Sequence, residues 1–325
     1  MADDTSDRRS MKEPIGRIDA DPALHARLVP LCRLKPGEIW EDPVAGHRVG
    51  VLDATDAGAV RRITGGAAPA LCIADPPYNV TVGSRRTPAL GKISMGDYDR
   101  FTHDWLDAIL PALAPDASFY AWLGADMANG LHPFPEFCLD MRARADWTAR
   151  NWVTLRNQRG YGTQANWMWV RQELLYYVRG KPPFHVAADY TDIPKILRGY
   201  YKQVAGERTE NAERGKGATI RAGNVWVDVQ QVFYRLHENV PGCYAQKPLK
   251  AIERIITASS DPGAIVIDPF AHSGTTLIAA ERTGRRALTF DLDPVFAEIA
   301  IRRLERLRAT GQPGWQCDHP FPELT

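Results

Sequence analysis

Short runs of apolar residues recur along the chain, and two of them end on an acidic residue followed by proline. Ala70 to Ala74 precedes Asp75, and Ala264 to Ile267 precedes Asp268. A short apolar run that stops at turn residues is typical of a strand buried in a parallel sheet. Proline ends such a strand because it has no N–H to give to the neighbouring strand. The pattern therefore predicts two core strands, each closed by an acid.

The segments between these runs indicate alternating strands and helices. His47 to Asp56 is a short apolar alternation that ends on acids, and Ala57 to Ile63 follows as a possible helix that two glycines break, which predicts one parallel strand–helix–strand crossover unit. Phe101 to Leu113 has helical spacing, and Phe119 to Leu123 has the composition of a core strand. We therefore expect an α/β fold: a doubly wound, mostly parallel sheet with helices on both faces and its ligands at the strands' carboxyl ends.

Composition narrows the function classes less than the pattern does. The 325 residues include 40 Lys and Arg against 39 Asp and Glu, so any DNA surface must come from local clusters rather than net charge. The five cysteines form no CxxC pair, the eight histidines have no metal-ligand spacing, and no signal peptide or long apolar segment is visible. We expect a reduced, cytoplasmic chain with no membrane segment and no metal.

The first acidic strand end carries the motif Asp75-Pro76-Pro77-Tyr78. A rigid turn of this kind holds a carboxylate, a free backbone carbonyl and an aromatic face together, which suits a planar amino group. The motif resembles the catalytic motif of the DNA amino-methyltransferases, which methylate N6 of adenine or N4 of cytosine with S-adenosylmethionine. Plain termination of a strand is the alternative interpretation.

The second acidic strand end opens a strand–loop–helix unit. The run to Asp268 is followed by a loop of small residues and then a helix that ends at Gly284, so the loop amides and the helix N-terminus are free to bind a carboxylate. The next strand, Ala287 to Phe290, ends on Asp291, which is placed to accept hydrogen bonds from two ribose hydroxyls.

This unit resembles the same family's cofactor motif, Asp-Pro-Phe-x-Gly-Ser-Gly-Thr-Thr. The matching residues are Asp268, Pro269, Phe270, Ser273, Gly274, Thr275 and Thr276, with Asp291 in the ribose-binding segment. The departure is His272, which stands where the family has its first glycine. Its side chain could crowd the cofactor's methionine portion or demand a less favourable backbone, and we expect it to be tolerated with a shifted loop.

Two further segments match the family's cofactor contacts. Gln246, Lys247 and Pro248 match the Gln-Lys-Pro segment that packs beside the cofactor's methionine end. Asp53 matches an acid that contacts the adenine ring of the cofactor, although its residue type suits a helix cap equally well.

The order of the motifs is the feature that selects the subfamily. The catalytic turn comes first and the cofactor loop last, as in the circularly permuted beta class, whereas RNA guanine and protein glutamine methyltransferases place the loop before the turn. Over about residues 47 to 308, the resemblance implies a Rossmann-like methyltransferase fold with an inserted target-recognition region, S-adenosylmethionine as cofactor and double-stranded DNA as substrate. It also suggests a homodimer and a possible cognate restriction endonuclease.

Three segments are candidates for DNA contact, because Lys and Arg neutralise phosphates while polar and aromatic side chains reach bases. They are a polar loop from Thr81 to Tyr98, a Gly-rich hairpin connection, and a block from Thr191 to Arg221 with seven basic and four acidic residues. The candidate residues are Arg85, Arg86, Arg156, Arg159, Tyr161, Gln164, Lys195, Arg198 and Lys202. A passive loop, a plain hairpin and a solvated helical face are the respective alternatives.

The expected organisation has five parts. They are a flexible N-terminal arm (1–35), the catalytic half of the methyltransferase domain (36–180), the target-recognition insertion (181–240), the cofactor-binding half (241–310) and an irregular C-terminal tail (311–325).

The resemblance implies direct methyl transfer to a flipped-out base. Asp75 and the Pro76 carbonyl would accept the amine's two hydrogens while Tyr78 stacks on the base. Adenine N6 is the first expectation because Asp at the motif's first position is commonest in adenine enzymes. Cytosine N4 is the alternative, and a non-catalytic DNA-binding relative is a third reading, prompted only by His272.

Overall fold

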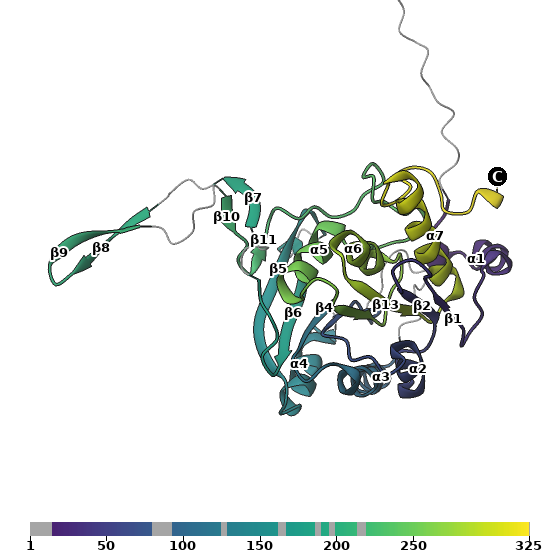
Figure 1. The fold of residues 1–325 in the computed structure, drawn as a ribbon, viewed down its shortest axis with the longest axis horizontal. Coiled ribbons are helices and arrows are strands. Elements are labelled where there is room, and N and C mark those ends of the chain that lie inside the picture. The colour runs from purple at the N-terminus through teal and green to yellow at the C-terminus, as the bar shows by residue number, and fades with distance from the viewer. Residues whose placement is uncertain are drawn as a thin grey trace, which may run out of the picture.

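A nine-stranded sheet forms the centre of the molecule (Figure 1). The computed structural model describes residues 15–79, 93–124, 129–161, 167–185, 190–194, 199–212 and 219–324. The strand order is β1-β2-β13-β12-β3-β4-β6-β5-β11. The strands are β1 (Ile39–Glu41), β2 (Arg48–Val51), β3 (Leu71–Ala74), β4 (Ala117–Leu123), β5 (Thr148–Tyr161), β6 (Trp169–Arg179), β11 (Val225–Trp226), β12 (Ile265–Asp268) and β13 (Arg286–Asp291).

Helices cover both faces of this sheet, which confirms the doubly wound α/β prediction. One face carries α5 (Leu249–Ser259), α6 (Thr275–Thr283) and α7 (Pro294–Thr310). The other carries α2 (Ala57–Thr64), α3 (Met95–Ile109) and α4 (Phe134–Ala143). The strand β4 is buried on both faces. Tyr120 and Trp122 belong to the core on the side of α5, α6 and α7, whereas Phe119 and Leu123 belong to the core on the side of α2, α3 and α4.

The strands β2, β13, β12, β3 and β4 run parallel, and β1 and β6 pair antiparallel at either side. The crossover predicted around residues 47 to 74 exists as β2, α2 and β3, but its two strands are not neighbours in the sheet. The later strands β12 and β13 lie between them. Sequence order alone does not reveal such an insertion, because the pairing partners are some two hundred residues away.

The two aromatic runs predicted as an antiparallel pair are β5 and β6, and their register includes Trp152 opposite Leu175. The short strand β11 adds to β5 in parallel at the edge, which the sequence did not indicate. The helix expected at 101–113 begins earlier, at Met95, because the Ser94 side chain accepts a hydrogen bond from the Asp97 N–H and caps it. It ends in the short helix η3 (Leu110–Ala112).

The described residues of the basic block from Thr191 to Arg221 form strands outside the main sheet. β7 (Tyr190–Pro194) pairs with β10 (Thr219–Arg221), and β8 (Gly199–Val204) pairs with β9 (Glu207–Ala212). Figure 1 shows the β8–β9 hairpin projecting well away from the body of the molecule. The alternative reading of this block as a helical face is therefore wrong for its described residues.

The expectation that the whole arm 1–35 is flexible is wrong from residue 15 onward. The segment folds into η1 (Ile18–Ala20), α1 (Pro22–Leu28) and η2 (Val29–Leu31). Leu24 and Leu28 lie in a core cluster with Phe296 and Ile299 of α7. The burial of these apolar side chains explains why the arm is held.

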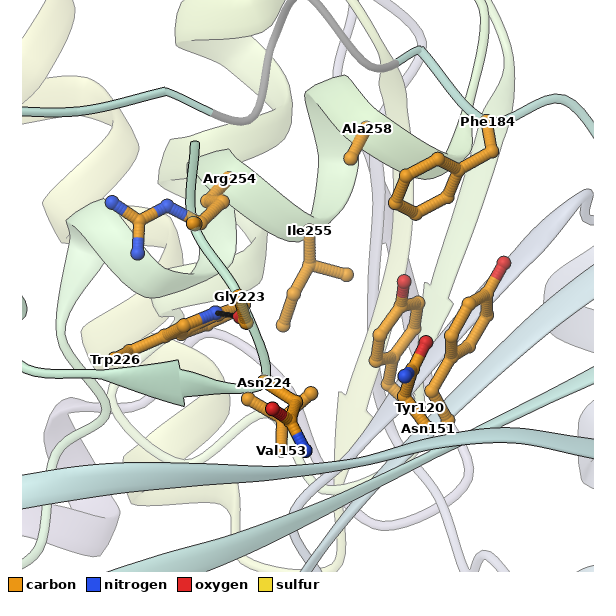
Figure 2. Close-up of a pocket in the computed structure, with 12 residues that line it drawn as sticks. Tyr120, Asn151, Val153, Phe184, Gly223, Asn224, Trp226, Arg254, Ile255 and Ala258 are labelled. Carbon is orange, nitrogen blue, oxygen red and sulfur yellow. Dashed lines mark hydrogen bonds between the residues drawn. The ribbon is translucent and has the colours of Figure 1, made fainter. Parts of the chain in front are cut away.

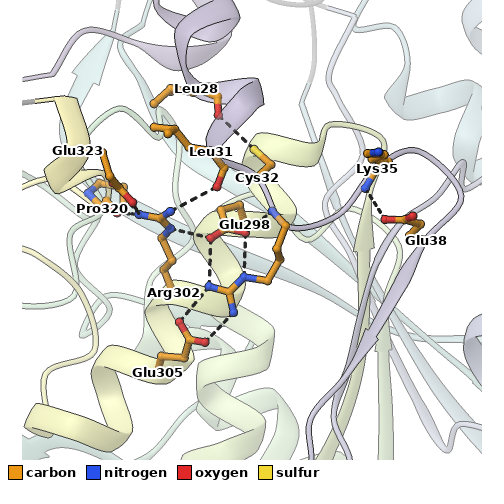
Figure 3. Close-up of polar contacts among 11 residues, drawn as sticks. Leu28, Leu31, Cys32, Lys35, Glu38, Glu298, Arg302, Glu305, Pro320 and Glu323 are labelled. Carbon is orange, nitrogen blue, oxygen red and sulfur yellow. Dashed lines mark hydrogen bonds and ion pairs between the residues drawn. The ribbon is translucent and has the colours of Figure 1, made fainter.

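The C-terminal tail, expected to be irregular, is also packed. Trp315 and Phe321 join the same cluster, and the chain closes with η6 (Pro322–Leu324). Figure 3 shows the polar contacts that fasten both ends to α7, centred on Glu298. Its buried carboxylate pairs with Arg33 and Arg302, and Arg302 in turn reaches Glu323. Among the described helices, none is long and apolar enough to cross a membrane.

Candidate functional site

The acid that follows β3 is hydrogen bonded through both of its carboxylate oxygens. The Tyr78 hydroxyl donates to Oδ1 of Asp75 at 2.7 Å, and the Lys247 ammonium donates to Oδ2 at 2.6 Å. The lysine lies just before α5, 172 positions along the chain. The fold thus brings the Asp-Pro-Pro-Tyr turn and the Gln-Lys-Pro segment into direct contact.

Two tyrosines hold the turn in place. The Tyr98 hydroxyl of α3 donates to the Pro77 carbonyl at 2.7 Å. The Tyr78 ring lies flat against the backbone at Gly124, where an added Cβ would stand only 2.7 Å from a ring carbon. Burial, with a contribution from Asp75, raises the pKa of Tyr78 well above its ordinary value, so its hydroxyl stays protonated and can donate.

The small-residue loop begins at the end of β12 with a second acid. Asp268 accepts a hydrogen bond from the Phe270 N–H at 3.0 Å and another from the Thr276 hydroxyl at 2.6 Å. Its carboxylate thereby closes the loop onto the first turn of α6. Burial raises the pKa of Asp268 to about 7, because the charged form loses hydration that two hydrogen bonds only partly replace.

Glycine is required in the loop at Gly274. Its backbone is left-handed (φ 73°), and a Cβ there would lie 2.7 Å from the Cβ of Ala300 on α7. The loop therefore packs directly on the helix.

His272 also has a left-handed backbone, with φ 43°, and its ring lies 4.6 Å from the Phe296 ring of α7. The left-handed backbone is the less favourable conformation expected for a histidine at this position. Burial lowers the pKa of His272 to about 4, so the imidazole is neutral at pH 7.

Asp291 closes β13 beside this loop. It accepts hydrogen bonds from the backbone N–H groups of His272 and Asp293, at 2.9 and 3.0 Å. Burial raises its pKa to about 6. A carboxylate has about four acceptor positions, so Asp291 keeps acceptor capacity for hydroxyl donors.

Arg303 is a site-supporting residue that sequence reasoning missed. Fully buried on α7, it donates to the Ser273 carbonyl, the Thr275 hydroxyl, the Pro313 carbonyl and the Glu238 carbonyl. It thus ties the cofactor loop to two other segments. The sequence offered no signal, because Arg303 follows another arginine in a helix whose polar residues suggest exposure.

A small cavity of about 20 Å³ lies where these segments meet. Its lining includes Asp75, Lys247, Asp268, His272 and the indole of Trp122. The Trp122 ring nitrogen is buried and has no hydrogen-bond partner among the described residues. Three more of the predicted cofactor residues line this cavity: Phe270, Ser273 and Thr275.

Three predicted cofactor residues have other roles in the structure. Gln246 uses its side-chain oxygen on the Val240 N–H and its amide on the Glu238 carbonyl, so it braces a turn. Pro248 is the N-cap of α5. Asp53 follows β2, outside the cavity lining, and holds Thr55 in a local turn.

The predicted DNA contacts are only partly within the described structure. Arg156 is exposed on β5. Arg159 and Tyr161 lie on β5 and Lys202 on β8, but their side chains are outside the description, as are the residues Arg85, Arg86, Gln164, Lys195 and Arg198 altogether.

Comparison with known proteins agrees with this geometry. A family model described as DNA methylase matches residues 70–302. The chain is 27% identical over 235 residues to the type II methyltransferase M.HpaI of Haemophilus parainfluenzae, which covers 72% of this chain and 68% of that relative. It is 42% identical over 85 residues to the DNA adenine methyltransferase YhdJ of Escherichia coli strain K12, 26% of this chain and 28% of the relative.

Among solved structures, the fold is similar to that of the PvuII DNA methyltransferase, which is described as cytosine-N4-specific. The TM-score is 0.54 at 14% identity, over 83% of this chain and 89% of the other. At this identity the likeness concerns the fold alone.

Proposed function

This chain belongs to the DNA methylase family, and we propose that it transfers the methyl group of S-adenosylmethionine to the exocyclic N6 amine of adenine in double-stranded DNA. The contact between Asp75 and Lys247 is the observation that carries the proposal. It joins an acceptor-rich turn suited to an amino group to the segment that leads into the cofactor half. A non-catalytic relative would not be expected to keep this contact.

The residues around the small cavity fit S-adenosylmethionine in their charge and hydrogen-bonding groups. Asp268, which lines the cavity, and the half-buried Asp291, which hydrogen bonds the loop at His272, are acceptors whose pKa values are raised chiefly by loss of hydration. The unpartnered Trp122 ring nitrogen is a buried donor at the same place. We infer that Asp291 holds the ribose hydroxyls and that the loop from Ser273 to Thr275 holds the amino-acid end.

The cavity is far smaller than the cofactor, so side chains must move when the cofactor binds. A volume of about 20 Å³ has room for little more than a water molecule. Lys247 and His272 line it and are the side chains best able to move, since Lys247 has a flexible four-carbon stem. Movement of Lys247 would also release one oxygen of Asp75.

When bound, the cofactor supplies an electrophilic methyl group on a positively charged sulfur. Asp75 and the Pro76 carbonyl accept the two N–H hydrogens of the target amine, which orients the nitrogen lone pair. Tyr78 keeps one oxygen of Asp75 fixed through its hydroxyl, a role different from the base stacking expected from sequence. A methylated amine would have one proton to lose, and Asp75 would be placed to accept it.

Adenine is the proposed target because the motif begins with Asp75 and because a related segment occurs in a protein named as an adenine methyltransferase. The cytosine-N4 alternative has a counterpart in the PvuII enzyme, but that likeness concerns only the fold. A cognate restriction endonuclease and a homodimer, both expected from the family resemblance, are further parts of this proposal.

The proposal is tested by identifying the methylated nucleoside. The purified protein is incubated with methyl-labelled S-adenosylmethionine and mixed-sequence duplex DNA, and the digested nucleosides are separated by mass spectrometry. Label on N6-methyldeoxyadenosine is expected. Label on N4-methyldeoxycytidine would overturn the choice of base, and no label on DNA would overturn the proposed activity.

A further inference from the structure

A second and larger cavity lies away from the Asp75 site. It measures about 400 Å³, within the range of about 300 to 1,000 Å³ that is usual for ligand pockets. It lies between α5 and strands β4, β5, β6 and β11, and its lining shares no described residue with the cavity at Asp75. The proposed methyl transfer does not account for it.

Aromatic rings form two sides of this cavity. Figure 2 shows Trp226 on one side and Tyr120 on the other, with Ile255 of α5 above and Val153 and Asn224 below. Tyr120 is stacked on Tyr176, with ring centroids 4.2 Å apart and planes only 4° from parallel. An aromatic wall favours a flat aromatic ligand, because a ligand ring can pack against it by stacking or edge-to-face contact.

Two side-chain amides lie at the edge of the cavity. Asn151 and Asn224 are exposed at its edge. The Asn224 amide nitrogen donates to the Trp152 carbonyl. The side-chain oxygen of Asn224 takes no part in this hydrogen bond. A carboxamide both donates and accepts hydrogen bonds, as the edge of a nucleobase does.

Among the described residues of the lining, the one cation is already paired with a carboxylate. Both terminal nitrogens of Arg254 donate to the buried carboxylate of Asp228, at 3.1 and 2.5 Å, and the guanidinium lies 4.9 Å above the Trp226 ring. A charged phosphate would have to compete with Asp228 for this group. The cavity is therefore better suited to a neutral ring than to an anion.

The cavity also lies at the base of the recognition insertion. Phe184 enters it from the start of the insertion, and Ala222 to Trp226 enters from the strand that returns to the sheet. The returning strand is fixed to β5, since the Thr154 N–H donates to the Asn224 carbonyl at 2.8 Å. A ligand here would contact Phe184, near the start of the insertion, and the returning segment Ala222 to Trp226 at once.

We propose that this cavity is a nucleobase-binding site, separate from the methyl-transfer site, which takes a neutral purine or pyrimidine ring between Trp226 and Tyr120. The ring can come from a free nucleoside or from an unpaired base of a DNA strand. Occupation of the site braces Phe184 and the segment Ala222 to Trp226 of the insertion against the sheet.

The test is calorimetric titration of the full-length protein with adenosine, with cytidine, and with a short single-stranded oligonucleotide of mixed sequence. S-adenosylhomocysteine is kept saturating so that the adenosine part of the cofactor site is occupied. The variant Gly223→Leu adds a bulky apolar side chain at a residue that lines the cavity and where an added Cβ meets no atom within 4 Å. The control is Gly96→Leu, which is equally open and lies on α3 across the sheet.

At least one of the three probes is expected to bind, with a Kd that rises at least about tenfold in Gly223→Leu and is unchanged in Gly96→Leu. The variant Asn151→Leu, at an exposed position, gives a second reading and should also weaken binding. Binding of nucleosides identifies a free ligand, whereas binding of the oligonucleotide alone identifies a strand base. No binding of any probe, or binding indifferent to both cavity variants, would overturn the proposal.

Discussion

Tyr78 has a hydrogen-bonding role that its place in the motif does not reveal. Its hydroxyl donates to Asp75, and its ring is fixed against Gly124. We predict that Tyr78→Phe, which keeps the ring, lowers the single-turnover rate of methyl transfer by about tenfold, since a hydrogen bond to a charged group is lost. The control is Tyr234→Phe. The Tyr234 side chain is exposed, and its hydroxyl accepts a hydrogen bond from Arg235. An unchanged rate in Tyr78→Phe would show that stacking alone matters.

Asp268 gives the chain a recognisable pH dependence. Burial raises its pKa to about 7 in the folded protein, whereas an unfolded aspartate titrates near about 4. Between these values the folded state binds more protons, so this residue's contribution to stability falls as pH rises from about 4 to about 7. We predict that Asp268→Asn gains stability relative to wild type across this window, by up to about 1.4 kcal/mol per pH unit.

The measurement for this residue is urea unfolding of both proteins, without cofactor, at pH 5, 6 and 7. Because the two proteins differ only at residue 268, the pH dependence of the difference in their unfolding free energies reports the charge of Asp268. A difference that stays constant with pH would contradict the raised pKa.

At the scale of elements, the cofactor loop depends on its contact with α7. Gly274→Ala adds a Cβ to a left-handed residue and drives it to 2.7 Å from Ala300. The matched control is Gly284→Ala, which is equally left-handed at φ 69° but meets no atom within 4 Å. We predict that the control loses about 1 kcal/mol of unfolding free energy and that Gly274→Ala loses about 2 kcal/mol or more, measured by urea unfolding. Equal losses would contradict the close packing.

Arg303 braces the same loop from the other side. Arg303→Met leaves the carbonyls of Ser273, Pro313 and Glu238 without this donor. We predict a loss of about 3 kcal/mol in unfolding free energy and weaker binding of S-adenosylmethionine, because buried acceptors left unpaired are costly. Arg306→Met, one turn away and bonded to Gly314 at the surface, should cost less than about 1 kcal/mol. Similar losses in the two variants would show that Arg303 is no special brace.

The elements that sequence predicted well are those set by local pattern. The strands before Asp75 and Asp268 are short apolar runs ended by proline, and both are found as β3 and β12. What local pattern could not give is the neighbour of each strand, since β12 and β13 insert between β2 and β3. The burial of Arg303 was equally hidden, because it is imposed by segments far away in sequence.

At the scale of the whole molecule, the ends of the chain were the least predictable part. The charged residues at the start of the chain indicated a flexible arm. Leu24 and Leu28, however, have the spacing of one helix face. Both ends pack on α7, the helix that also holds the cofactor loop through Arg303. The described parts of the two ends therefore support the cofactor loop through their contact with α7.

The basic block from Thr191 to Arg221 leads to a prediction about the salt dependence of DNA binding. The residues Lys195, Arg198 and Lys202 lie in this block. We predict that replacing all three with alanine weakens binding to duplex DNA and lowers the slope of log Kd against log salt by up to about 3, since each phosphate contact releases about one counterion. Arg61→Ala with Arg62→Ala, on the exposed side of α2, is the control pair and should leave the slope unchanged. An unaltered slope in the triple variant would place the DNA contacts elsewhere.

The central claim, that Asp75 takes part directly in methyl transfer, is tested most directly by Asp75→Asn. Single-turnover transfer to duplex DNA is measured for this variant and wild type, with the Kd for S-adenosylmethionine determined in parallel. We predict a transfer rate at least about a hundredfold lower, because one acceptor for the target amine becomes a donor, while the Kd for the cofactor changes by less than about threefold. Transfer by Asp75→Asn at close to the wild-type rate would contradict the account.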